Sequence, residues 1–131
     1  MAGPPQMDIG TDGEMARYPK VLEYLQHVAG ESDRVLYEEL GKTTEGNPYV
    51  LLKISSPENL ARLDRLVEIN RRLADPRGLD ESEAMALAAE GRPFSSLYAT
   101  IQPTEVGNGQ AVPLIVHRWT TEDSKEVQEI L

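Results

Sequence analysis

Gln102 and Glu105 are the side chains whose types and spacing best suit metal chemistry in this sequence. They lie three residues apart in TIQPTEVGNGQ, residues 100–110, after a segment of strand-like composition. Pro103 favours an extended Gln102 and suits the first position of a helix, which would place Glu105 in the first helical turn. Both side chains could then point at one ion. A glutamate in a first turn is also stabilised by the helix dipole without any ligand, so spacing alone leaves both interpretations open.

The remaining metal-ligand types are sparse, because the chain has no cysteine and only two histidines, His27 and His117. Any metal site must therefore use His, Asp or Glu side chains. His117 follows Glu105 by twelve residues in the same predicted helix, which separates them by about 18 Å along its axis. His27 is predicted on the polar side of the first helix. We therefore expect neither histidine to share a metal with Glu105.

Length and charge limit the class of protein. With 131 residues and 40% apolar content, the chain is predicted to form one domain over residues 18–131, preceded by a flexible arm over residues 1–17. The net charge of −9 and the absence of a basic, aromatic-rich patch argue against a nucleic-acid partner. The sequence contains no apolar run long enough to indicate a membrane-spanning helix. The N-terminus lacks the pattern of a secretion signal, so the cytoplasm is the default expectation for localisation.

Hydrophobic periodicity predicts an α/β fold with a mixed, incomplete sheet. Apolar residues at helical spacing predict a first helix from Tyr18 to Ala29, ended by Gly30. The segment YVLLKI, residues 49–54, is almost continuously apolar, which favours a strand covered on both faces. The further predicted elements are a hairpin with strands at 34–40 and 48–55, helices at 55–73 and 80–91, a strand at 92–101, a helix at 103–120 and a last helix within 123–131.

Several blocks of the chain resemble a known family when taken in order. These blocks are YPKVLEYLQ, RVLYEELGKTTEGNPYVLLKISSPENLARLD, EINRRLADPRGL, IQPTEVGNGQ and TTEDSKEVQEIL. Together they resemble the N-terminal part of the zinc carboxypeptidases of the carboxypeptidase A-like metallopeptidase family, from about Tyr18 to the last residue. The resemblance implies a carboxypeptidase-like fold, a peptide substrate, a zinc cofactor and hydrolysis of C-terminal peptide bonds.

The same resemblance assigns roles to Gln102 and Glu105. In the family, a His-x-x-Glu motif supplies two zinc ligands, a distant histidine supplies the third and water takes the fourth position. Glu105 matches the ligand glutamate, whereas Gln102 occupies the position of the first histidine. A neutral amide is a much weaker zinc ligand than an imidazole nitrogen. The sequence also ends at Leu131, before the regions that carry the other functional residues of the family, so we expect this chain to bind zinc weakly and to be inactive.

Two alternatives remain open. The chain could be a non-catalytic peptide-binding pseudopeptidase that keeps the fold without the metal. It could also be a marginally folded fragment, since a sheet of about three strands leaves apolar faces uncovered. Such faces favour self-association of the chain through the uncovered sheet.

Overall fold

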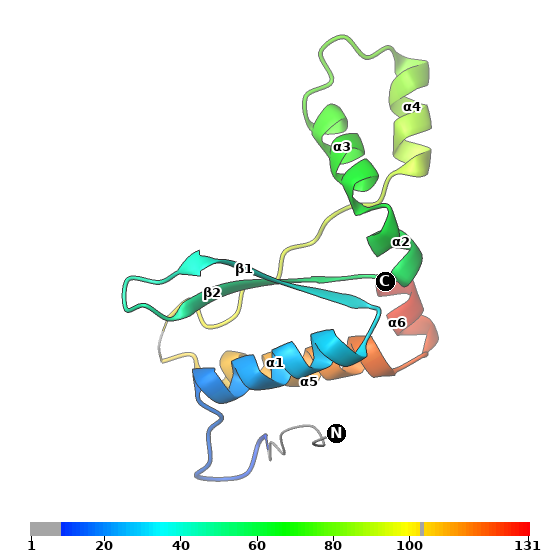
Figure 1. The fold of residues 1–131 in the computed structure, drawn as a ribbon. Helices are drawn as coiled ribbons and strands as arrows, with labels where there is room; N and C mark the ends of the chain where they lie inside the picture. Colours follow the sequence, from blue (N-terminus) through cyan, green and yellow to red (C-terminus); the bar gives the residue numbers. More distant parts are fainter. Residues whose placement is uncertain (1–8, 103) are drawn as a thin grey trace. The chain divides into compact units, whose positions relative to one another are not determined.

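The computed structural model describes residues 9–102 and 104–131 and divides into two compact units (Figure 1). The first unit contains the residues up to Leu60 and the segment Tyr98–Leu131, and the second contains Ala61–Leu97. The elements are α1 (Tyr18–Glu31), β1 (Val35–Lys42), β2 (Pro48–Ile54), α2 (Pro57–Ala61), α3 (Leu63–Ala74), α4 (Glu81–Glu90), α5 (Val106–Thr121) and α6 (Lys125–Ile130).

Helix α1 confirms the first predicted helix. The apolar residues that recur at helical spacing along it are all buried: Val21, Leu22, Leu25 and Val28. The helix continues one residue past Gly30 and ends where the backbone N–H of Ser32 donates to the carbonyl of Val28. The sequence predicts that Gly30 ends this helix. In the structure Gly30 is instead its penultimate residue.

The predicted hairpin is also confirmed, with β1 and β2 antiparallel. Gly46 adopts a φ of +82°, a left-handed conformation that glycine reaches without steric cost, and its N–H donates to the carbonyl of Thr43. A bulge lies between Glu39 and Gly41, where the pairing shifts by one residue. Turn chemistry encoded in a few adjacent residues thus sets the position of the hairpin.

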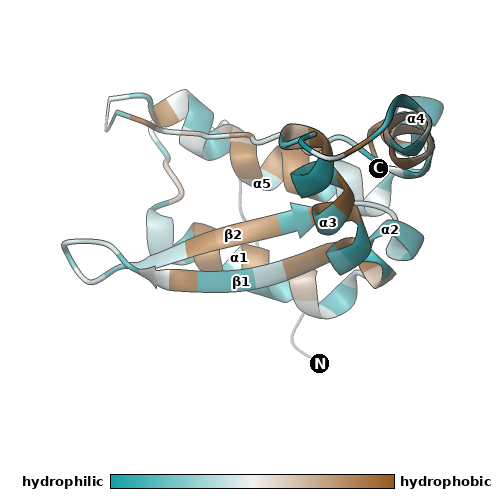
Figure 2. Ribbon diagram, turned by 90° about the horizontal axis from the view of Figure 1, so that it is seen from above, coloured by the Kyte–Doolittle hydropathy of each residue, from teal (hydrophilic) through white to brown (hydrophobic). Residues whose placement is uncertain are grey.

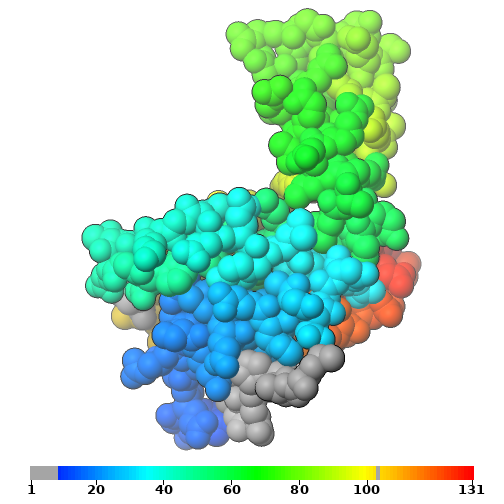
Figure 3. All heavy atoms as spheres, in the orientation of Figure 1, coloured from blue at the N-terminus to red at the C-terminus, as the bar shows by residue number. Residues whose placement is uncertain are grey.

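Only one face of the hairpin is covered within the first unit. The alternating residues Val35, Tyr37, Leu52 and Ile54 pack on the core formed with α1 and α5. The residues between them point away, and Tyr49 and Leu51 are 54% and 40% exposed. The expectation that residues 49–54 are covered on both faces is therefore wrong. Figures 1 and 3 show the hairpin lying along α1.

The second unit is a pair of helices, α3 and α4. Ile69 of α3 is 0% exposed, and Leu66 and Leu87 are buried beside it in the same unit. Asp80 and Glu83 form a capping box at the start of α4, which confirms the predicted acidic first turn. The predicted helix 55–73 is instead two helices, because Arg62 has φ −115° and ψ 23°, outside the helical region, and separates α2 from α3.

The predicted strand 92–101 does not form. Within the described residues the sheet has two strands, and the backbone of 92–101 joins neither. Composition favours a strand here, but a strand also needs a partner that accepts its hydrogen bonds. Thr100 has a φ of +59°, which interrupts the extended conformation. The apolar side chains of the segment remain exposed: Phe94, Leu97, Tyr98 and Ile101.

The described residues therefore combine helices with a two-stranded antiparallel sheet, which agrees with the predicted mixture of α and β structure. Helix α5 confirms the helix predicted for 103–120, although it begins at Val106, and α6 confirms the last one. Among the described residues, every helix is too short or too polar to cross a lipid bilayer.

Candidate functional site

Gln102 and Glu105 lie at the start of α5 and bond to each other. The backbone N–H of Glu105 donates to the carbonyl of Gln102 at 3.0 Å, and the Glu105 carboxylate accepts from the Gln102 N–H at 3.4 Å. Glu105 is the N-cap residue of α5 and not part of its first turn, and Gln102 does not end a strand. Pro103 lies outside the described residues. The pair therefore forms a closed turn at the helix start.

Thr100 and Gly109 hold this turn against α5. A Cβ atom at Gly109 would lie 2.8 Å from the Oγ1 atom of Thr100, so a larger residue at 109 would require the Thr100 side chain to shift. Thr100 is β-branched and has a φ of +59°, an uncommon conformation for such a residue. The backbone thus leaves the extended conformation at Thr100, two residues before Gln102.

The side chains of this turn do not fit a zinc centre. Catalytic zinc sites use three protein ligands drawn from His, Glu, Asp and Cys. The turn supplies one carboxylate and one neutral amide, and the carboxylate already accepts the Gln102 N–H. Among residues 9–102 and 104–131, no set of three His, Asp or Glu side chains is placed to hold a metal ion.

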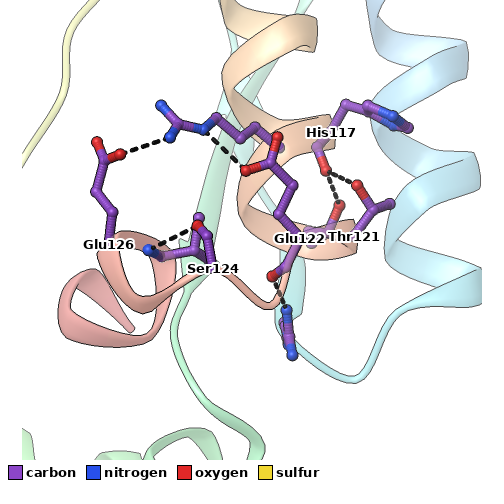
Figure 4. A network of polar contacts seen from close by, with 9 residues as sticks. His117, Thr121, Glu122, Ser124 and Glu126 are labelled. Carbon is purple, nitrogen blue, oxygen red and sulfur yellow. Dashed lines mark hydrogen bonds and ion pairs between the residues drawn. The ribbon is translucent and has the colours of Figure 1, made fainter.

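Both histidines line a groove of about 850 Å³ in the first unit. The walls come from α1, the loop that follows it and the C-terminal half of α5; besides the histidines they include Tyr24, Val28, Glu31, Asp33, Arg34, Pro113, Leu114 and Asp123. His27, which the sequence predicts on the polar side of the first helix, is partly buried there. In Figure 4 the His117 ring extends toward α1. The structure thus brings together two side chains that are 90 positions apart in the sequence.

Sequence reasoning missed this groove, although a signal was present. Tyr24, His27, Val28 and Glu31 recur at spacings of three and four residues, so they form one stripe along α1. Such a stripe mixes apolar and polar types and fits neither a buried core nor a charged surface. It could have indicated a partly open groove, but it could not have identified α5 as the facing wall.

The polar groups of the groove are mainly acidic. Arg34 pairs with the carboxylate of Asp123 and also donates to the backbone carbonyl of Glu122 at 2.8 Å. Glu31 and Asp33 are exposed and make no ion pair among the described residues. Burial raises the pKa of the Tyr24 phenol, which therefore remains neutral at pH 7. The three carboxylates of Glu31, Asp33 and Asp123 outnumber the single guanidinium of Arg34, so the groove carries an excess of negative charge.

A polar network stabilises the corner between α5 and α6 at one end of the groove (Figure 4). Arg118 contacts the carboxylates of Glu122 and Glu126 at 3.1 and 2.6 Å, and their hydrogen bonds raise the pKa of the guanidinium, with that from Glu126 the larger cause. The Ser124 hydroxyl accepts the N–H of Val127 at 3.4 Å and so caps α6. These contacts join the C-terminal end of α5 to α6.

Comparison of the chain with protein-family models, curated proteins and solved structures finds no significant match. Membership of the zinc carboxypeptidase family, which the sequence blocks resemble, is therefore a proposal. The chemistry available to the chain must be argued from its own residues.

Proposed function

We propose that this chain is a zinc carboxypeptidase-like protein whose zinc corner, formed by Gln102 and Glu105, has lost its metal affinity. The observation that carries the proposal is the residue type at 102. An amide in place of an imidazole removes one of the nitrogen donors that a tetrahedral zinc site requires. Glu105 is then the one family-type ligand in the turn, and it bonds to the Gln102 N–H.

Zinc is the group that would supply catalysis in such a family, by lowering the pKa of a bound water and polarising the peptide carbonyl. In this chain Glu105 occupies the N-cap position of α5 without a side-chain capping hydrogen bond, and its carboxylate accepts the Gln102 N–H. On this proposal the chain hydrolyses no peptide by itself. Its function is then binding, inherited from a peptidase.

The test is the zinc content of the full chain after loading and dialysis. We expect the natural chain to lose zinc and Gln102→His to bind it more tightly, because the substitution restores an imidazole next to Glu105. Adding Glu105→Ala to that variant should remove the gain. Gln128→His, at an exposed glutamine of α6, is the matched control and should gain nothing.

A natural chain that kept stoichiometric zinc would overturn the proposal, above all if it also cleaved a C-terminal reporter peptide. Loss of that cleavage in Glu105→Ala would assign the activity to this turn. Circular dichroism of each variant separates a lost ligand from a lost fold.

A second candidate function is peptide binding in the groove between α1 and α5. The apolar side chains Tyr24, Val28 and Leu114 could contact aliphatic groups, while Glu31 and Asp33 favour a cationic side chain. This observation supports a partner peptide that alternates leucine with lysine or arginine. It also agrees with the proposed pseudopeptidase, since no metal is needed.

Titration with a leucine–lysine peptide tests this function against a leucine–glutamate peptide of equal length. We expect the lysine peptide to bind more tightly, and the double variant Glu31→Gln with Asp33→Asn to weaken it about fivefold, because exposed charges contribute little each. Glu45→Gln, in the hairpin turn, is the matched control. Equal binding of both peptides would reject a groove selective for cations.

A further inference from the structure

The outward face of the β1–β2 hairpin carries an apolar strip beside one acid and one base. We define the outer hairpin face as Leu36, Glu38, Tyr49, Leu51 and Lys53. Their positions alternate with the residues that pack on α1, which places all five on the opposite face of the sheet. Leu36, Tyr49 and Leu51 are 45%, 54% and 40% exposed.

The apolar side chains of this face are Leu36 on β1 and Tyr49 and Leu51 on β2, and Lys53 follows them on β2. Figure 2 shows hydrophobic colour over most of β2, to which the inward-facing Leu52 and Ile54 also contribute. An isolated two-stranded sheet is only marginally stable, and exposed large apolar groups on it favour association. The face therefore has a physical reason to be covered.

The charges on the face indicate what could cover it. Glu38 and Lys53 form an ion pair at 2.5 Å across the two strands, next to the exposed leucines. A face that holds one acid and one base side by side is self-complementary under a two-fold axis. A second copy turned by 180° would bring its Lys53 toward Glu38 and its leucines onto Leu36 and Leu51.

We infer that two copies of this chain pair through their outer hairpin faces. Strand spacing and rise make the face about 26 Å long and two strands wide, so it lies at the small end of specific interfaces. The dimer is therefore weak and depends on concentration. This inference does not rest on zinc or on peptide binding, so either proposal can fail without the other.

Sedimentation of the full chain over a wide range of concentration tests the pairing. We expect a monomer–dimer equilibrium that Leu51→Asp weakens at least about tenfold, since it places an unpaired carboxylate in the apolar strip. Leu97→Asp, at an exposed leucine outside the hairpin, is the matched control and should leave the equilibrium unchanged.

Charge reversal gives a sharper test of the two-fold arrangement. Glu38→Lys and Lys53→Glu should each dimerise less than the natural chain, because like charges then face each other across the axis. Mixed together, the two variants should restore a dimer that contains one copy of each. Non-specific aggregation would show no such preference.

Two results would overturn the inference. One is a natural chain that stays monomeric at every concentration; if Leu51→Asp then lowers its melting temperature, the face is covered within one copy. The other is dimerisation that persists unchanged in both Leu51→Asp and Glu38→Lys. Circular dichroism of each variant shows whether it is folded, so that loss of the dimer can be distinguished from unfolding.

Discussion

At the scale of single residues, Gly91 shows how closely the second unit is packed. It follows the last residue of α4, and a Cβ atom there would lie 2.8 Å from Cγ2 of Ile69 and 3.0 Å from the carbonyl oxygen of Leu87. Ile69 is 0% exposed, so its side chain is enclosed by other atoms of the protein. The backbone of Gly91 has a φ of −68°, which any residue can adopt. The constraint at this position is therefore the space for a side chain.

Gly91→Ala should therefore destabilise the second unit by about 1–3 kcal/mol, the usual cost of overpacking. Amide hydrogen exchange of α3 and α4 measures this loss directly. Gly30→Ala is the matched control. Gly30 lies in helix α1, and a Cβ atom added there would meet no atom within 4 Å. It should leave α1 as stable or raise its stability by up to about 1 kcal/mol. Unchanged exchange in Gly91→Ala would show that Ile69 repacks.

The residue type at position 102 also has a direct consequence for zinc binding. The type of Gln102 alone predicts weak zinc binding, because a neutral amide is a poor zinc ligand in any geometry. The bonds between Gln102 and Glu105 could not be predicted, since they depend on the backbone conformation of the turn and not on residue type. The composition of the candidate site was therefore readable from the sequence, and its arrangement was not.

At the scale of elements, an ion pair joins α3 to α4. Arg65 donates to Glu90 at 2.8 and 2.5 Å, and this hydrogen bonding is the main cause that lowers the pKa of Glu90. A carboxyl whose pKa falls on folding stabilises the folded state above its unfolded pKa of about 4.3. That contribution is lost as the pH falls through the lower folded value.

Glu90→Gln should therefore unfold at a lower temperature than the natural chain at pH 7, and the difference should disappear well below pH 4. Thermal melts at several pH values measure it. Both side chains are about half exposed, so the expected difference is small. Glu23→Gln removes an exposed charge that has no ion pair among the described residues and should show no comparable pH dependence. A difference that persists at low pH would assign the effect to packing.

The elements also show where local patterns succeed. The helices α1, α4 and α5 and the hairpin follow from spacing, capping residues and turn glycines, which act between neighbours in the sequence. The strand predicted for residues 92–101 does not form, because a strand needs a partner strand and the local sequence does not supply one. The interruption at Arg62 escaped prediction because the residues around it continue a helical pattern without a glycine or proline.

At the scale of the whole molecule, the acidic net charge of −9 opposes close approach of two copies. The outer hairpin face has local charges of both signs, so its pairing must overcome only the general repulsion. Salt screens that repulsion over about 8–10 Å at ordinary ionic strength. The weak, concentration-dependent dimer inferred above is consistent with this balance.

The sequence by itself determined the inventory of groups: no cysteine, two histidines, an amide at 102 and a carboxylate at 105, together with helices α1, α4, α5 and α6 and the hairpin. These follow from residue types and from interactions between neighbours along the chain. The tertiary structure alone decided that both histidines share a groove and that the hairpin has an uncovered face. Both depend on which distant segments pack together, a choice made by long-range burial of apolar surface and not by local pattern.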